Sequence, residues 1–480
     1  MLPKSLETEC GNPRFPPAVL LGVEDPVPTE YPKVSEEDAD GEELANLYIM
    51  FTTNMRVTRP EILRGVRASE VLRHLPWVWL RRDLTSLYPL SHEAAKFDQF
   101  WSHSWKGALW AKYVNIFYLQ TCLPANIVGI ISASVACVLV SEGLLEARKG
   151  WCLLLGFAGF CVTPLLWRSG KVVFLDMACI NQRDQGLKGE AIISMGAFLK
   201  QSDSMLVLWA VLQIIPPLLG PALLGGEILF GLACVAYAYM ETSLASSEDL
   251  RFSAAVHVVY HGGLGILCSG FLAHALQGYA RSVETLNEQL CGFKAAGTSS
   301  TCCEQGHGPE TETTVVCDRA ILFQCITHWY GSLDKFESQV QSEVRTALID
   351  QLANKSMSYQ RLLLFFTPYV WIRFEYTASY GGDHIRQLVD LTQTFTYWMA
   401  VYPFMNKLLF RLCYRFRARC CRLHRDILLS VAVVITAFLY YITFYIIQLY
   451  VFQQNKHDLV LSMISLVSWL AVTAILWRIT

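Results

Sequence analysis

Long uninterrupted apolar stretches dominate the pattern of this chain. A helix needs roughly 18 uncharged residues to cross the hydrocarbon core of a bilayer. Six stretches reach that length: Tyr113–Ser141, Gly150–Trp167, Ser204–Gly226, Phe252–Ala280, Ile427–Asn455 and Leu459–Trp477. Three shorter runs are Ile228–Met240, Leu362–Ile372 and Leu391–Asn406. The pattern therefore predicts between six and nine membrane spans.

A different pattern lies between Lys171 and Trp209. The apolar run Val172–Leu175 ends at Asp176, as a buried parallel strand does when it ends at a polar edge. Apolar residues then recur at helical spacing, and Met205–Leu208 indicates a second buried strand. Strand, helix and strand in this order predict a small α/β unit with a parallel sheet. The residues at helical spacing are Leu187, Ala191, Ile192, Met195, Phe198 and Leu199.

The carboxyl ends of such strands are where ligands and catalytic groups gather. Asp176 follows the first strand directly, and a polar loop comes after it. We therefore expect any chemistry at Asp176 and at the loop residues Cys179, Asn181, Gln182, Arg183 and Asp184. Asp176 also has an alternative interpretation, as a hydrogen-bond acceptor that caps the end of the strand.

Composition narrows the class of protein. Charged residues make up only 17% of the chain, against about 25% in a typical soluble domain, which excludes an ordinary soluble enzyme. The formal net charge of -2 gives no broad basic surface, so no nucleic-acid partner is expected. The 16 cysteines are scattered, several inside apolar runs, and are interpreted mainly as small apolar side chains.

A cluster of arginines precedes the Ile427 stretch and bears on orientation. Its members are Arg411, Arg415, Arg417, Arg419, Arg422 and Arg425, with no acidic residue among them. By the positive-inside rule this segment faces the cytosol, and both termini are predicted to be cytosolic. The guanidinium groups would attract anionic lipid. Cys413, Cys420 and Cys421 lie beside them and are candidates for palmitoylation, although such clusters also act as topology determinants alone.

Several motifs resemble a known family. The sequences "FWSHSW" at Phe100–Trp105, "WAKY", "VVFLDMACINQRD" and "SDSMLVLW" resemble the Toll/interleukin-1 receptor (TIR)-like domain of large multipass proteins from dinoflagellate algae. The "CINQ" core is also similar to fungal heterokaryon-incompatibility (HET) domains. The segment Asp318–Val340 resembles a helical segment of the same multipass proteins. The resemblance implies that Ser102 and His103 end the first strand, that residues 106–120 form the first helix, and that a membrane hairpin precedes the second strand.

The combined prediction is an α-helical multipass membrane protein with a small cytosolic α/β (TIR-like, parallel-sheet) module that a membrane hairpin interrupts. Residues 1–45 are expected to form a disordered acidic tail. Residues 46–112 hold the N-terminal region with the first strand and helix, 113–167 the hairpin, and 168–209 the rest of the module. Further spans follow in 210–280, and a cytosolic helical region with a disordered loop at 294–314 occupies 281–360. A C-terminal membrane bundle fills 361–480.

One helix within the region 281–360 carries clear signals. Ser332 is a predicted N-cap, and apolar residues recur every four positions on one face. They are Phe336, Val340, Val344, Leu348 and Leu352. We expect this face to pack in a core, with recognition of another chain as the alternative.

The resemblance favours a signalling or scaffold protein of the membrane whose TIR-like module associates with copies of itself. The alternative is an NAD hydrolase. Catalytic TIR domains resemble one another in a Trp-Cys-x-x-Glu segment, which is missing after Trp209, so the carboxylates left as candidates are Asp176 and Glu190. Glu190 is expected in the first turn of its helix, where it would favour the helix dipole. NAD is a cofactor only under this alternative.

A third hypothesis is ion transport. His257, His261 and His274 lie in one uncharged stretch, where ionisable residues can mark an ion path and where neutral, hydrogen-bonded histidines are the alternative. A metal site is not expected. Cys302, Cys303 and His307, with Cys317, Cys325 and His328 after them, lack the paired spacing of a zinc site.

Overall fold

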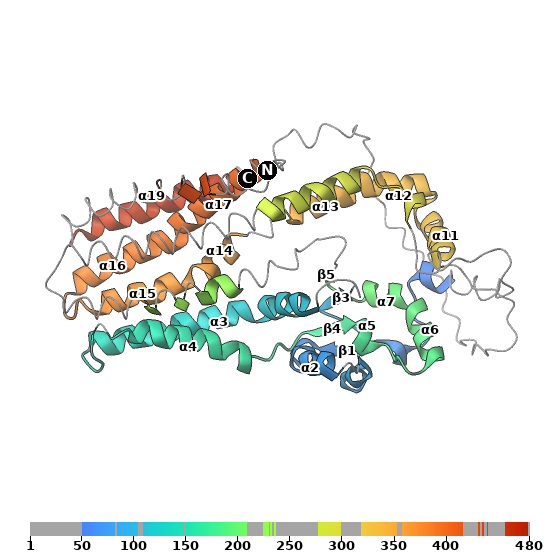
Figure 1. The fold of residues 1–480 in the computed structure, drawn as a ribbon, viewed down its shortest axis with the longest axis horizontal. Coiled ribbons are helices and arrows are strands. Elements are labelled where there is room, and N and C mark those ends of the chain that lie inside the picture. The colour runs from blue at the N-terminus through green and yellow to red at the C-terminus, as the bar shows by residue number, and fades with distance from the viewer. Residues whose placement is uncertain are drawn as a thin grey trace, which may run out of the picture.

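The computed structural model is mostly helical, with one small mixed sheet. Figure 1 shows three parts: an α/β unit, an elongated helical bundle that extends from it, and a helical arm that lies above the unit in this view. The structure describes residues 50–81, 84–103, 109–147, 149–208, 224–229, 231–232, 235–236, 277–298, 318–352, 358–415, 431–432, 434–435, 439 and 457–478. The predicted tail, residues 1–45, lies outside these ranges.

The sheet has five strands in the order β2-β1-β4-β3-β5. Strand β3 pairs in parallel with β4 and β5, as predicted, whereas β1 runs antiparallel to both β4 and β2. The expectation of a purely parallel sheet is therefore wrong. The reason is β1. Its sequence, RGVR, has no apolar run from which a strand could be predicted. The strands are β1 (Arg64–Arg67), β2 (His92–Glu93), β3 (Gln99–His103), β4 (Val172–Leu175) and β5 (Met205–Leu208).

Aromatic rings fill the centre of the α/β unit. Phe174 of β4 stacks on Phe100 of β3, with ring centroids 4.8 Å apart, and lies 4.3 Å from the ring of Phe198. Phe97 and Trp101 are fully buried beside them. The surrounding elements are η2 (Pro60–Ile62), α2 (Ala68–Arg81), η3 (Leu84–Leu90), α5 (Asp176–Cys179), α6 (Gln185–Ile193) and α7 (Met195–Lys200). The predicted single helix through Leu187 and Leu199 is thus two helices, which meet at Ser194.

Two long apolar helices separate β3 from β4 in the sequence. Helix α3 (Leu109–Ser141) leaves the end of β3, and α4 (Trp151–Leu166) returns to the start of β4. The predicted first helix and first span are one continuous helix, about 50 Å long at 1.5 Å per residue. Because β3 and β4 pair side by side, the hairpin leaves the sheet and comes back to it. This confirms the expectation that both halves of the sheet meet across an inserted hairpin.

The hairpin packs closely against α15 (Thr367–Ala378) through small residues. Glycines at 129 and 156 lie so near Trp371 that a Cβ atom on either would be 2.7 Å from its ring. Close approach through glycine and alanine is typical of helices packed in membranes. Glu375 of α15 adds a polar contact, since its carboxylate accepts the Gly150 and Cys152 backbone N–H groups, both at 2.9 Å. The carboxylate thus satisfies free donors at the positive end of α4.

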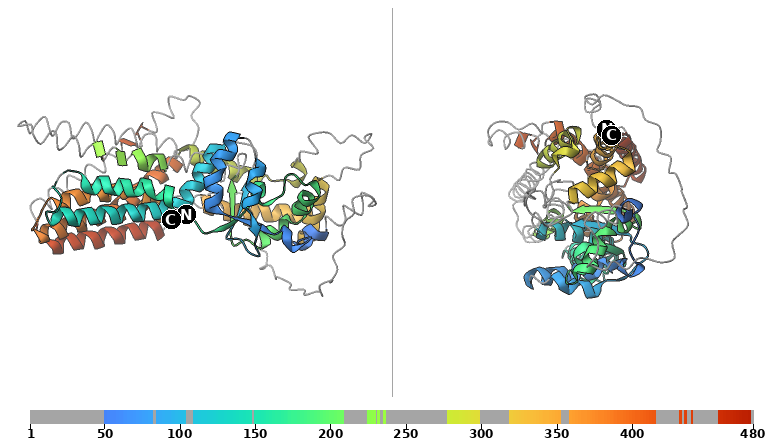
Figure 2. Two further views of the ribbon diagram at one scale, coloured as in Figure 1. Left: turned by 90° about the horizontal axis from the view of Figure 1, so that it is seen from below. Right: turned by 90° about the vertical axis from the view of Figure 1, so that its right-hand side faces the viewer.

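Helices from the C-terminal third complete the bundle, in which the long helices lie side by side (Figure 2). The predicted run Leu362–Ile372 divides at Phe366, and the run Leu391–Asn406 passes through a π-helical turn, η7. Side chains from two other helices bind the carbonyls of that turn: Tyr359 donates to Met399 O, and Thr473 donates to Ala400 O at 3.1 Å. The elements are α14 (Tyr359–Phe365), α15, α16 (His384–Thr396), η7 (Tyr397–Val401), α17 (Tyr402–Arg415) and α19 (Leu459–Arg478).

The arm contains the helix with the predicted cap. Ser332 Oγ accepts the Lys335 N–H at 3.2 Å, which confirms the N-cap. The apolar face packs against the helical residues 277–291 and against α17, so the expectation of core packing is correct. A π-helical turn interrupts the four-residue repeat, and Val344 is exposed. The arm comprises η4 (Ala295–Gly297), α11 (Asp318–Tyr330), α12 (Leu333–Gln339), η5 (Val340–Val344) and α13 (Arg345–Asp350).

Within the described ranges, two helices are long and apolar enough to cross a membrane. They are Lys112–Ser141, within α3, and Leu459–Arg478, which is α19. Helix α4 is apolar but has only 16 residues. The predicted span Ser204–Gly226 begins with β5, so its first residues are a strand. Most of the predicted spans Phe252–Ala280 and Ile427–Asn455 falls outside the described residues, and a multipass organisation stays a prediction.

We predict that Gly156→Ala destabilises the protein. The added Cβ would lie 2.7 Å from Trp371 Cγ, and overpacking of a filled interior costs about 1–3 kcal/mol. Thermal unfolding of the purified protein in detergent measures the effect. The control is Gly278→Ala, also in a helix, where a Cβ meets no atom within 4 Å and the higher helix propensity of alanine stabilises. An unchanged midpoint for Gly156→Ala would contradict the close packing described above.

Candidate functional site

The carboxyl ends of β3, β4 and β5 lie at one edge of the sheet, because the three strands are parallel. Trp101 is level with Leu175 in the β3–β4 register, so the following residues, Ser102 and Asp176, are level with each other. Ser102 is half-buried, and the strand ends at His103 as expected. The structure thus brings Ser102 and Asp176 together at the predicted edge.

Asp176 begins α5 directly after β4 and is engaged locally. Its Oδ1 accepts the Met177 backbone N–H at 2.7 Å. Burial raises the pKa of the Asp176 carboxyl above its ordinary value. The observed contact is the one expected of a carboxylate that caps the end of a strand.

Cys179 lies inside the core below this edge. Its Sγ accepts the Leu175 N–H at 3.4 Å and lies 3.8 Å from the carbonyl oxygen of Val173. Burial raises the pKa of the Cys179 thiol to about 12. Because the thiolate is the nucleophile and the metal ligand, a thiol with this pKa is inert at neutral pH. Cys179 therefore acts as a small buried side chain that ties α5 to β4.

The polar loop after α5 is built from turns and caps. Asn181 Oδ1 accepts the backbone N–H groups of Arg183 at 3.0 Å and of Asp184 at 3.3 Å. Asp184 Oδ1 accepts the Leu187 N–H at 3.1 Å and so caps α6. Gln182 is half-buried, and Arg183 is exposed. Asn181 and Asp184 therefore shape the loop.

Glu190 does not lie in the first turn of its helix, which corrects the expectation from the sequence. It is the sixth residue of α6, and its carboxylate binds the segment that leads into β1. Thr58 Oγ1 donates to Glu190 Oε2 at 3.0 Å, and Arg59 Nε donates to the same oxygen at 2.8 Å. This hydrogen bond raises the pKa of the Arg59 guanidinium. The sequence held no signal for this pair, whose members are 131 positions apart.

The structure describes some of the candidate lipidation, metal and transport residues, and the others lie outside its described ranges. Cys413 is completely buried between α17 and the arm, and its palmitoylation stays a prediction. Cys420 and Cys421 lie outside the described residues, as do Cys302, Cys303, Cys317 and His307. Arg411 and Arg415 lie in the last turns of α17, and the other arginines of the cluster fall beyond it. The three histidines considered for transport are also outside these ranges.

Two cysteines of the arm and its neighbouring helix form a hydrogen bond or a covalent bond. Cys325 is buried and accepts a hydrogen bond from Thr53 Oγ1 at 3.7 Å. Cys291 is disulfide-bonded. In the portion of the chain that the structure covers, no group of three His, Cys, Asp or Glu side chains is placed to hold a metal ion.

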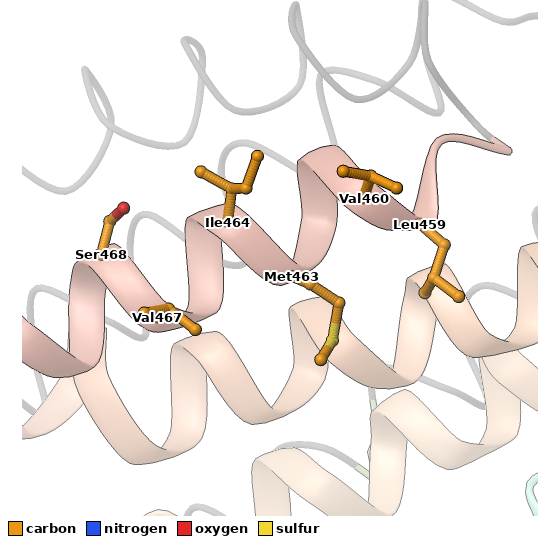
Figure 3. Close-up of a pocket in the computed structure, with 6 residues that line it drawn as sticks. All are labelled: Leu459, Val460, Met463, Ile464, Val467 and Ser468. Carbon is orange, nitrogen blue, oxygen red and sulfur yellow. The ribbon is translucent and has the colours of Figure 1, made fainter.

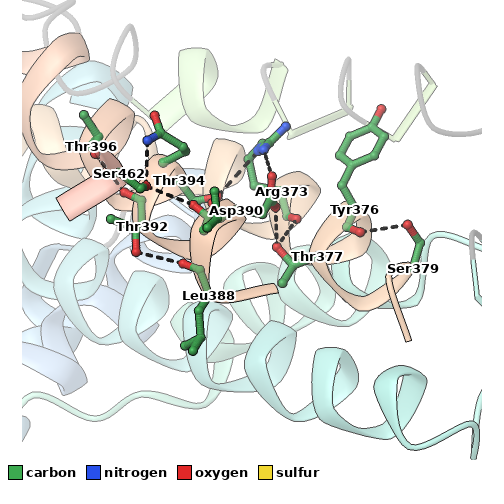
Figure 4. A network of polar contacts seen from close by, with 12 residues as sticks. Arg373, Tyr376, Thr377, Ser379, Leu388, Asp390, Thr392, Thr394, Thr396 and Ser462 are labelled. Carbon is green, nitrogen blue, oxygen red and sulfur yellow. Dashed lines mark hydrogen bonds and ion pairs between the residues drawn. The ribbon is translucent and has the colours of Figure 1, made fainter. Parts of the chain in front are cut away.

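A polar network runs through the interior of the bundle (Figure 4). Arg373 of α15 forms an ion pair with Asp390 of α16, whose second oxygen accepts a hydrogen bond from Thr377. Further along, Gln393 donates to Ser462 of α19 at 2.7 Å. The sequence analysis did not identify this network. Each of these contacts joins two helices, and such bonds hold helices together where water is excluded.

An open apolar groove lies along α19 (Figure 3). Leu459, Val460, Met463, Ile464, Val467 and Ser468 line it. The side chains of Val460 and Val467 are 70% and 62% exposed. The hairpin has a similar surface, with Ile131, Val135 and Val138 on α3 and Leu165 and Leu166 on α4 all exposed. Exposed apolar surface on this scale indicates contact with lipid or with another protein.

No family model, curated protein or solved structure matches this chain. The fold and the site therefore have to be interpreted from their own contacts.

We predict that Asp184→Ala loosens α6. Loss of an N-cap side chain costs about 1 kcal/mol, because the Leu187 N–H then has no acceptor. Amide hydrogen exchange over residues 185–193 should become faster, while exchange in α2 stays unchanged. Asp184→Asn is the control, since asparagine is an equally good cap. Equal exchange in the alanine and asparagine variants would show that this cap contributes nothing to α6.

Proposed function

We propose that this protein is a membrane signalling or scaffold protein, in which lipid surrounds the bundle and the α/β unit is an interaction module that associates with copies of itself. The observation that carries the proposal is the α3–α4 hairpin. It joins two adjacent strands of the sheet directly to a bundle with an exposed apolar surface. A protein–protein module is thereby fixed at the place where the chain enters lipid.

The exposed surface of the hairpin supports the membrane part of this proposal. Ile131 and its exposed neighbours lie on a helix whose 30 residues Lys112–Ser141 exceed the length that a bilayer core requires. The opposite face of the same helix packs through glycine and alanine, as membrane helices do. Exposed apolar residues outside and small residues inside are the distribution expected of a helix in lipid.

The contacts at the carboxyl edge of the sheet favour an interaction module over a hydrolase. Asp176 accepts a backbone hydrogen bond at a strand end, and Glu190 pairs with Arg59 on another part of the unit. Each of the two carboxylates considered for NAD cleavage therefore has a role in the packing of the unit.

Strand β5 supports self-association. It is an end strand of the sheet, and no described strand pairs with its outer side. Phe100 N–H donates to Ser204 O at 2.8 Å, so in a parallel ladder Ser204 O and Leu206 N–H face β3. Met205, which is level with Phe100, then directs its own N–H and C=O away from β3. An unpaired strand edge is a template for pairing with another chain.

We predict that Ile131→Lys interferes with insertion while Ile192→Lys does not. The two side chains are similarly exposed, at 56% and 50%, but Ile131 lies on the hairpin and Ile192 on the α/β unit. Lysine at the centre of a span costs about 3 kcal/mol in lipid and nearly nothing in water. Retention in membranes after alkaline carbonate extraction, together with thermal unfolding in lipid nanodiscs, measures the difference. Equal tolerance of both lysines would exclude lipid around α3.

We predict that Met205→Pro reduces association between copies of the protein. Proline removes the outward N–H of Met205, yet at the first position of the strand it keeps the bonds to β3. Energy transfer between labelled full-length copies in nanodiscs should fall at least threefold. Leu206→Pro is the contrasting variant, because it removes a donor to β3 and should unfold the edge of the sheet. Association of Met205→Pro at the wild-type level would rule out the β5 edge as the contact.

A further inference from the structure

Two cysteines face each other across the α3–α4 hairpin. Cys137 lies one turn before the end of α3, and Cys152 lies in the first turn of α4. A side-chain hydrogen bond joins the two thiols, and both are free in the structure. Cys152 belongs to the apolar core of the bundle, and Cys137 packs against that core. Two thiols from different helices are therefore direct neighbours.

The backbones of these two helices approach each other closely. A Cβ atom on Gly129 of α3 would lie 3.1 Å from the carbonyl oxygen of Gly156 on α4. A Cβ atom on Gly159 of α4 would lie 2.8 Å from Ser132 Oγ of α3. A disulfide requires Cα atoms no more than about 7 Å apart. Contact through glycine brings two helices to the short separation that such a bond needs.

The thiol pair continues the antiparallel alignment that these glycine contacts define. Cys137 and Cys152 each lie between one and two turns nearer the tip of the hairpin than Ser132 and Gly159 do. Glu375 of α15 also fixes the first turn of α4, because its Oε2 accepts the Cys152 backbone N–H at 2.9 Å. Two neighbouring helices therefore set the position of Cys152.

The pair lies near the end of the bundle that is farthest from the α/β unit (Figure 1). The tip of the hairpin there carries the exposed charged residues Glu142, Glu146 and Lys149, which keep it in contact with water. Cys137 is half-buried, whereas Cys152 has no exposed surface. A soluble oxidant can therefore reach Cys137 from the aqueous end of the hairpin, and Cys152 lies next to it.

We propose that Cys137 and Cys152 are a disulfide site that closes the tip of the hairpin. The oxidant is a low-molecular-weight disulfide, such as oxidised glutathione. The Cys137 thiolate attacks one of its sulfur atoms and releases one glutathione, and the Cys152 sulfur then displaces the second one. The two protein thiols are oxidised to one disulfide. Oxidised glutathione is reduced to two thiols, which take up the two protons that the cysteines lose.

The compartment in which the bond forms rests on the proposed function. If the hairpin crosses the membrane and the α/β unit is cytosolic, the tip reaches the opposite side, where disulfides form and persist. The contact between the thiols does not depend on that orientation, and cross-linking of the purified protein tests it alone. Equal tolerance of lysine at Ile131 and Ile192 would exclude the membrane position and leave the cross-link in detergent unchanged.

The test is oxidation of the full-length protein in detergent with oxidised glutathione, followed by alkylation of the remaining thiols and digestion with trypsin. Trypsin cleaves after Lys149, between the two cysteines, so their peptides stay joined only through a disulfide. Mass spectrometry without reduction should show the joined peptides. Their amount should fall at least tenfold in Cys137→Ser and in Cys152→Ala. The control Cys161→Ser, also on α4, should keep the wild-type amount.

Thermal unfolding shows whether the bond fits the native fold. Closing a loop of about 15 residues should raise the wild-type midpoint on oxidation by about 3–5 °C, and Cys137→Ser should show no such rise. A stable glutathione adduct on Cys137 without joined peptides would overturn the proposal. So would joined peptides that form only in denaturant, or a midpoint that falls on oxidation.

Discussion

Helix α3 runs without a break from the α/β unit into the bundle. Its first turns place Ile116 in the core of the sheet, and its later turns place Ala125 and Ala133 in the core of the bundle. One helix therefore belongs to two hydrophobic cores that would otherwise be separate domains. Because β3 leads into α3 and α4 leads back into β4, a displacement of the hairpin acts directly on the two central strands. A movement of the bundle is therefore transmitted to the α/β unit through the hairpin.

The buried carboxylates described in the bundle differ in their hydrogen-bond partners. Asp390 and Glu375 are bonded to side chains or backbone groups of neighbouring helices, so they fix the positions of α15, α16 and α4. Glu227 accepts a hydrogen bond from the hydroxyl of Tyr118 on α3.

Local sequence patterns predicted part of the candidate site. The apolar run before Asp176 correctly indicated a strand, and the resemblance correctly ended the preceding strand at Ser102 and His103. Residue type alone also singled out Asn181 and Asp184. Their roles as turn and cap depend on which backbone N–H groups lie near, and that is decided by the conformation of the loop. The partner of Glu190 could not be predicted either, because Arg59 lies far away in the sequence and meets it only in the folded unit.

Elements with a local signal could be predicted from the order of residues alone. Continuous apolar runs specified α3, α4, β4 and α19, because the burial of such runs needs no particular partner. A hydroxyl before a helix specified the cap at Ser332 for the same reason. Three features follow from the folded arrangement alone: β1 makes the sheet mixed, Glu190 binds Arg59, and Arg373 pairs with Asp390. These features are pairings between distant segments, and a single chain of residue types carries no record of which distant segments meet.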